Sequence, residues 1–165
     1  KINNLNNIAM NYQLDEIDKK ILDFLVENTR MPFTEIAKQM DVSAGTIHVR
    51  VKKMEDAGII LGSSLNIDYG KLDYHFTAFI GILLTKSNRT QEVLKELASI
   101  PNVVEASVIS GKYNIFCKVR AKHTEDAKRI IYQIDDIQDV MRTESMISME
   151  EYLSDRNRLI NAISI

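Results

Sequence analysis

Apolar residues recur at helical spacing along the first third of the chain. Ile17, Ile21 and Phe24 lie at i, i+4 and i+7, and this spacing predicts a helix that ends near residue 27. Asp15 precedes them and is a good helix N-cap. Pro32 is tolerated at the start of a helix, so we expect a second, shorter helix after it.

A third helix is expected after a turn at residue 42. Ser43 can cap its N-terminus, and Ile47, Val51 and Met54 give it one apolar side at i, i+4 and i+7. Three short helices joined by tight turns indicate a helix-turn-helix domain, which we assign to residues 14–60.

Beyond residue 60 the pattern changes to the alternation typical of β-strands. Leu65, Ile67 and Tyr69 alternate with other residues, so residues 61–75 are expected to form a linking strand or small hairpin. Residues 76–152 then show the order strand, helix, strand, strand, helix, strand, which indicates a ferredoxin-like βαββαβ domain and an α+β fold class. These six elements are predicted at residues 76–85, 90–100, 103–109, 115–121, 124–136 and 140–149.

The two ends of the chain lack such a pattern. Residues 1–13 begin with an Asn-rich stretch without amphipathic period, and we expect them to be a tail that is disordered or not native. Residues 153–165 are expected to be a C-terminal tail.

Composition narrows the class of protein. With 165 residues, 45% of them apolar and 27% charged, the chain is typical of a globular protein and is not disordered throughout. No apolar run approaches the roughly 18 residues of a membrane span. A single cysteine, Cys117, cannot form an internal disulfide, which favours a reducing, cytoplasmic setting. The net charge of −2 means that any contact with nucleic acid must come from a local cluster of cations.

Such a cluster lies on the expected third helix. Residues 42–54 hold three basic residues and no acidic one, and the side opposite the apolar stripe combines small, polar and basic residues. This pattern is typical of a helix that enters the major groove of DNA, although a solvated basic helix in a small bundle is the alternative. The candidate DNA-binding residues are Ser43, Gly45, Thr46, His48, Arg50, Lys52 and Lys53.

A second candidate site is the glycine-containing stretch from Ser110 to Asn114, between two expected strands. On spacing alone an ordinary hairpin turn is the better interpretation. Exposed amides beside Tyr113 and Asn114 could nonetheless hold a small zwitterion, whose carboxylate needs N–H donors and whose ammonium needs oxygen acceptors.

The sequence offers no set of catalytic residues. No two of its three histidines have the spacing of a metal pair, and Cys117 alternates within a strand as a small core residue does. The carboxylate pairs at residues 135–136 and 150–151 are adjacent, so their side chains diverge. We therefore expect no enzyme, no metal site and no cofactor.

From residue 14 to residue 159 the chain resembles the Lrp/AsnC family, the leucine-responsive and asparagine-regulator (feast/famine) transcription factors. The stretches that carry the resemblance are Leu14–Asp18, Ile21–Leu22, Glu35–Lys38, Val42–Ser43, Arg50–Val51, Met54–Ile60, Ser110–Asn114 and Arg142–Glu144. The resemblance implies a winged-helix-like DNA-binding domain, a linking strand, and a ferredoxin-like domain that dimerises and binds an amino acid. Such dimers often assemble into tetramers or octamers.

The effector site of this family lies between dimers. The resemblance places it at the turn Gly111, Lys112, Tyr113 and Asn114, with contacts from Thr143 and Ser145 on the last strand. Many members carry an acidic residue at the positions of Lys112 and Asn114, and Gly45 and His48 also differ from the commonest family residues. The leading hypothesis is a sequence-specific, cytoplasmic and nucleoid-associated regulator of transcription that responds to an amino acid. The alternative is a DNA-organising protein with little or no effector response.

Overall fold

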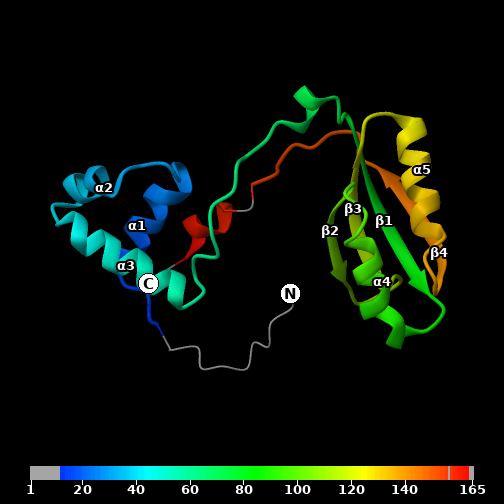
Figure 1. Cartoon of the computed structure of the whole chain (residues 1–165), viewed down its shortest axis with the longest axis horizontal. Helices are drawn as coiled ribbons and strands as arrows, with labels where there is room; N and C mark the ends of the chain where they lie inside the picture. Colours follow the sequence, from blue (N-terminus) through cyan, green and yellow to red (C-terminus); the bar gives the residue numbers. More distant parts are fainter. Residues whose placement is uncertain (1–11, 156, 164–165) are drawn as a thin grey trace. The chain divides into compact units, whose positions relative to one another are not determined.

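The computed structural model describes residues 12–155 and 157–163, which fall into two compact units. One unit takes the chain up to Leu65 together with the segment from Leu153 onward, and the other is Asn66–Tyr152. The first unit contains α1 (Glu16–Glu27), α2 (Phe33–Met40), α3 (Ala44–Asp56) and the 3-10 helix Arg158–Ala162. The second contains the 3-10 helices Tyr69–Leu72 and Ser87–Arg89 and the elements β1 (Phe76–Leu84), α4 (Thr90–Leu97), β2 (Val103–Val108), β3 (Ile115–Ala121), α5 (Thr124–Asp135) and β4 (Val140–Ile147) (Figure 1).

Side-chain caps explain where the helices of the first unit begin. Asp15 accepts hydrogen bonds from the backbone N–H groups of Ile17 and Asp18, and the Asp18 carboxylate accepts one from the Asp15 N–H, which completes a capping box. Ser43 Oγ accepts from the Thr46 N–H at 3.0 Å. The three predicted helices and both predicted caps are confirmed.

The core of the first unit forms where the three apolar stripes meet. The fully buried side chains Ile21, Ile36, Ile47 and Met54 lie at its centre. Because Ile47, Val51 and Met54 are all buried, the rotation of α3 about its axis is the one predicted from the sequence.

Parts of the two segments assigned to tails pack against the core of the first unit. Ile160, in the 3-10 helix near the C-terminus, packs against the helical core, and so does Tyr12. The sequence pattern did not predict the packing of Ile160, because one apolar residue in a single 3-10 turn shows no periodicity. The remainder of the expected N-terminal tail, residues 1–11, lies outside the described residues.

The linking strand or hairpin expected at residues 61–75 is wrong. Residues 61–68 have no regular structure, and Tyr69–Leu72 form a 3-10 helix whose first turn is capped by Asp68. Leu61 is 93% and Leu65 71% exposed. Alternation shows only that side chains can point to two sides, whereas a strand also needs a neighbour for its backbone hydrogen bonds. Within the described part of this chain no strand pairs with the segment.

The second unit is a four-stranded antiparallel sheet in the order β2-β3-β1-β4. The order of its elements along the chain is the βαββαβ order predicted from the sequence. Helices α4 and α5 lie against one side of this sheet (Figure 1). On that side Ile80 and Ile82 of β1 and Ile130 of α5 are fully buried in a single core.

The register of the sheet decides on which side each candidate residue lies. Ser145 pairs with Ile80 and Thr143 pairs with Ile82, so both lie on the side of the helices. Glu144 pairs with Gly81 and therefore lies on the side that α4 and α5 do not cover.

The reactivity of the Cys117 thiol provides a test of how this core is packed. It is 1% exposed, and burial raises the pKa of its thiol to about 12. We expect a thiol reagent to modify Cys117 at least about a thousandfold more slowly in the native protein than in urea, because access requires opening of the domain core. Rapid modification of the native protein would contradict this packing.

The same shift makes stability depend on pH. The folded state holds the proton more tightly than the unfolded chain, whose thiol has a pKa of about 8.5. Stability is therefore lost as the pH rises from about 8.5 to 12, by up to about 1.4 kcal/mol per pH unit. Urea titrations of the native protein and of Cys117→Ala should differ by this slope.

Candidate DNA-binding and ligand-binding sites

The exposed side of α3 carries most of the candidate DNA-binding residues. Ser43, Gly45, His48, Lys52 and Lys53 are exposed, while Thr46 and Arg50 are half-buried. Val49, which also lies on this side, is 53% exposed. The small residues at the start of the helix leave room for a close approach of its N-terminus to a DNA backbone.

Local contacts orient several of these side chains. The Ser43 and Thr46 hydroxyls lie 2.9 Å apart at hydrogen-bond distance, and the rings of His48 and Phe33 form a T-shaped pair with their centroids 6.1 Å apart. Lys52 Nζ donates to Asp56 at 2.6 Å, and this hydrogen bond raises the pKa of Lys52. No ion pair is recorded for Lys53 among the described residues, so its charge is available to a phosphate.

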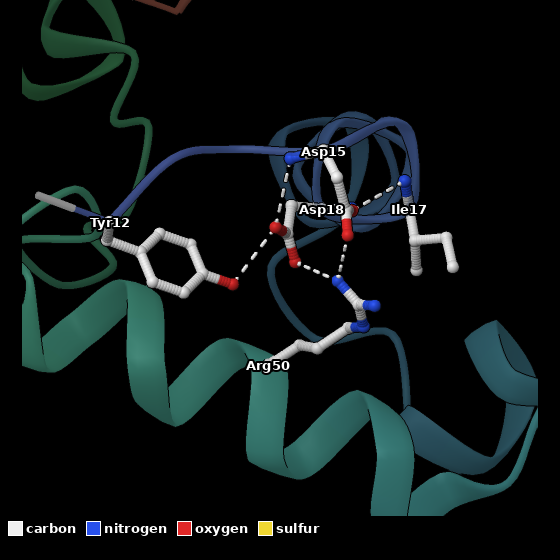
Figure 2. Close-up of polar contacts among 5 residues, drawn as sticks. All are labelled: Tyr12, Asp15, Ile17, Asp18 and Arg50. Carbon is white, nitrogen blue, oxygen red and sulfur yellow. Dashed lines mark hydrogen bonds and ion pairs between the residues drawn. The ribbon is translucent and has the colours of Figure 1, made fainter.

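Arg50, one of the candidate DNA-binding residues, contacts two carboxylates of the first unit. Its Nη1 donates to Asp15 Oδ2 at 2.8 Å and to Asp18 Oδ1 at 2.9 Å, and the Tyr12 hydroxyl donates to the other Asp18 oxygen at 2.9 Å (Figure 2). The guanidinium therefore binds two carboxylates of the α1 N-terminus. The sequence indicated Asp15 as a helix cap, but nothing in it indicated that Arg50 would reach this helix start.

Two pKa values record these contacts. The pKa of Asp15 is lowered, first by the Asp18 backbone N–H and then by Arg50. The pKa of Tyr12 is raised by burial and by its hydrogen bond to Asp18. Asp15 therefore stays ionised, and Tyr12 stays neutral, over a wider range of pH than usual.

The turn at residues 110–114 is joined to β4 through Glu144. Gly111 has a φ of 115°, a conformation that other residues rarely adopt, and Lys112 follows it. Lys112 Nζ donates to both Glu144 carboxylate oxygens at 2.7 and 2.8 Å, and the Tyr113 hydroxyl donates to one of them at 2.6 Å. Lys112 and then Tyr113 lower the pKa of Glu144. Arg142, two residues before Glu144, also forms an ion pair with it at 3.1 Å. Sequence analysis missed the role of Glu144 because its partners in the turn lie some thirty residues away.

Asn114 anchors this turn to the end of β1. Its side-chain oxygen accepts from the Leu84 N–H at 2.9 Å, and its own N–H donates to the Ile82 carbonyl at 2.9 Å. The amide that replaces the common acidic residue therefore already has a structural partner.

The remaining candidate residues lie apart from the Lys112–Glu144 pair. The Thr143 hydroxyl donates to Asp135 on α5 at 2.7 Å, which confirms that Thr143 faces the helices. Ser145 lies on the same side and is exposed. Within one chain the structure thus groups the turn with Glu144, and places Thr143 and Ser145 on the opposite side of the sheet.

Gly81 makes room for the Tyr113 ring. A Cβ atom added to Gly81 would lie 2.7 Å from three atoms of that ring, closer than real contacts allow. The ring also lies 6.3 Å from Phe116, on the side of the sheet that α4 and α5 leave uncovered. A residue without a side chain in β1 is thus what allows Tyr113 to reach Glu144.

The described part of the chain offers neither a metal site nor a membrane-spanning helix. No group of three or more His, Cys, Asp or Glu side chains there could hold a metal ion. None of the helices described there has the length and apolar content that crossing a membrane requires.

Family models match both units. A model of the AsnC-type helix-turn-helix domain matches residues 14–55, and a model of the Lrp/AsnC ligand binding domain matches residues 77–158. These matches confirm the α+β fold class predicted from the sequence and its division into a helix-turn-helix domain and a ligand-binding domain.

The similarity to known proteins covers nearly the full length of those proteins. The regulatory protein AsnC of Haemophilus influenzae is 41% identical over 140 residues, which are 84% of this chain and 93% of that protein. The solved structure of Escherichia coli AsnC has a TM-score of 0.82 at 36% identity and covers 87% of this chain and 97% of that one. A Neisseria meningitidis transcriptional regulator, solved in complex with L-Met, also has a TM-score of 0.82. It covers 88% of this chain and 96% of its own, and at 20% identity it shows the shared fold alone.

Gly81→Ala tests the close approach of Tyr113. The added methyl group must displace the ring, so we expect unfolding of the second unit to become easier by about 1 to 3 kcal/mol. The measurement is urea denaturation. In a Tyr113→Ala background the ring is absent, and the same glycine substitution should then cost much less. Equal costs in both backgrounds would show that the ring does not occupy this position.

Proposed function

The chain belongs to the Lrp/AsnC family of transcription regulators, and we propose that it binds a specific DNA sequence through α3 and responds to an amino acid. The observation that carries the first part is the exposed side of α3, where Lys52 and Lys53 follow a small, uncharged helix start. Its action is binding and not catalysis.

In the proposed complex the N-terminal half of α3 lies in the major groove. Thr46, His48 and Val49 face base edges, and Lys52 and Lys53 bind backbone phosphates. Two such helices, related by the two-fold axis of a dimer, enter successive grooves. Arg50 is left out of these contacts because its guanidinium already binds Asp15 and Asp18.

The proposed effector is an amino acid held near the turn at residues 111–114. Support comes from the match to a ligand-binding domain model and from the Neisseria regulator that carries L-Met. The Lys112–Glu144 pair offers the two charges that a zwitterion needs, a cation for its carboxylate and a carboxylate for its ammonium. Thr143 and Ser145 lie on the other side of the sheet, so a site that also includes them draws these residues from another copy of the chain.

Assembly into homodimers, and of dimers into tetramers or octamers, is part of the proposal. The side of the sheet that α4 and α5 leave uncovered carries the stacked rings of Phe79 and Phe116, and Met146 beside them is 42% exposed. An apolar surface of this kind is stabilised by burial. We place the regulator in the cytoplasm, on the DNA of the nucleoid.

The DNA-organising alternative has less support. The match to a ligand-binding domain model favours a regulator that responds to a small molecule. The test is to select duplexes from a random DNA library with the native protein, and to screen the twenty amino acids by thermal shift. A ligand at about 100 times its Kd should stabilise the protein by about 2.7 kcal/mol. Failure to enrich any sequence, with no thermal shift, would favour the alternative.

The two lysines of α3 provide the first prediction from this proposal. Lys52→Ala combined with Lys53→Ala should weaken binding to the selected duplex and to random duplexes by the same factor, because phosphate contacts carry little sequence information. The slope of log K against log salt should flatten by up to about 0.9 per lysine. Salt titrations measure both, and Lys95→Ala, which removes an exposed cation from α4, is the control. An unchanged slope would place the DNA-binding surface elsewhere.

Glu144 and Asn114 provide a second prediction, which concerns amino acid binding. Glu144→Gln removes the proposed partner of the effector ammonium and should weaken binding of the cognate amino acid by about tenfold or more, since a hydrogen bond to a charged group contributes about 1.5 to 3 kcal/mol. Asn114→Asp adds a carboxylate beside that ammonium and should tighten binding or widen the range of amino acids bound. Calorimetry measures both, with Glu96→Gln on α4 as the control. Unchanged affinity in both variants would move the ligand site away from this turn.

A further inference from the structure

Asp18 is a carboxylate with almost no contact with solvent, and it joins α1 to α3. It is 1% exposed and accepts hydrogen bonds from three donors of different origin. Figure 2 shows them converging on it: the Tyr12 hydroxyl, the Asp15 backbone N–H and Arg50 Nη1. Only Arg50 among them brings a positive charge, and it is also the only donor from α3.

A buried carboxylate constrains the residue that neutralises it. Removal of one partner of a buried ion pair leaves a charge that the interior cannot solvate, and this destabilises the arrangement in which the two helices pack. Arg50 Nη1 bonds Asp18 Oδ1 and Asp15 Oδ2 together, at 2.9 and 2.8 Å. A single nitrogen held by two oxygens on another helix restrains both the rotation and the axial position of α3.

Arg50 lies among the residues proposed to read DNA. Thr46 is four residues before it and Lys53 three residues after it, so both are its neighbours on the helix surface. These three side chains, with Asp15 and Asp18, line one shallow hollow beside the exposed side of α3. A displacement of this part of α3 therefore moves Thr46, which is proposed to face base edges, and Lys53, which is proposed to bind a phosphate.

We propose that Arg50 is a positioning residue whose bonds to Asp15 and Asp18 hold α3 where it discriminates between DNA sequences. The inference rests on the proposed use of α3 in DNA binding. Contacts with base edges depend on helix placement more strictly than contacts of flexible lysines with phosphates do. Loss of the network therefore lowers sequence discrimination, measured as the ratio of affinities for the selected duplex and a scrambled one.

Three other roles for Arg50 give different results. A phosphate contact would weaken binding to both duplexes equally and flatten the salt dependence. A purely structural role would lower the folded fraction, which also weakens binding to both duplexes by one factor. A direct contact with a base would lower the ratio in Arg50 variants alone, because Asp18 is too buried to touch DNA.

The experiment compares Arg50→Gln, Asp18→Asn and the double variant. Affinities for the duplex selected by the native protein and for its scrambled sequence are measured at several salt concentrations, with urea denaturation to obtain the folded fraction. Asp23→Asn is the matched control, since Asp23 lies on the same helix and forms an ion pair with Lys19 of α1. Arg50→Lys retains the charge but cannot reproduce the planar guanidinium.

We expect the ratio of the two affinities to fall about fivefold or more in Arg50→Gln and in Asp18→Asn. A fall of about fivefold corresponds to the loss of the discrimination that one weak base contact provides. The double variant should lose little more than either single one, Arg50→Lys should recover part of the ratio, and the salt slope should stay unchanged. Asp23→Asn should behave like the native protein.

An unchanged ratio in Asp18→Asn overturns the inference, as does a flattened salt slope in Arg50→Gln. If the Arg50→Gln or Asp18→Asn variant does not fold, Asp15→Asn is measured instead, because it removes only the half-exposed partner of Arg50. A ratio equal to that of the native protein then overturns the inference. Failure of the proposed function is recognised separately, by lysine variants of α3 that leave DNA binding unchanged.

Discussion

Satisfaction of the buried Asp18 carboxylate is the constraint on which the DNA-binding unit depends. A carboxylate removed from water needs hydrogen-bond donors and a compensating charge. Arg50 of α3 supplies the charge, and the Tyr12 hydroxyl and the Asp15 N–H are the two further donors. The capping box at Asp15 and Asp18 fixes the start of α1, and the same two carboxylates hold Arg50. Helix capping and helix-to-helix placement thus share their residues.

In the second unit, a few residues likewise fix the turn at residues 110–114 to the sheet. The missing side chain at Gly81 lets the Tyr113 ring approach β1, and the ring and Lys112 together bring two donors to Glu144. Asn114 ties the same turn to β1 through backbone groups. The turn therefore has a fixed geometry, with the opposite charges of Lys112 and Glu144 beside each other at its surface.

Most element types and the buried sides of α1 and α3 followed from the sequence because periodicity is a local property. The spacing of Ile47, Val51 and Met54 was enough to orient α3, and alternation was enough to bury Cys117 in β3. The same reasoning failed at residues 61–68, where alternation is present but a strand neighbour is missing from the described chain. It also missed Ile160, whose burial depends on a surface formed by other helices.

The sequence by itself determined two domains, their fold class, a basic α3 and the turn that begins at Gly111. Only the tertiary structure decided which polar side chains meet. It paired Arg50 with Asp15 and Asp18, paired Lys112 with Glu144, and separated that pair from Thr143 by the thickness of the sheet. The physical reason is that an ion pair depends on distance in space, and residues about thirty positions apart acquire a distance only when helices pack and strands take their register.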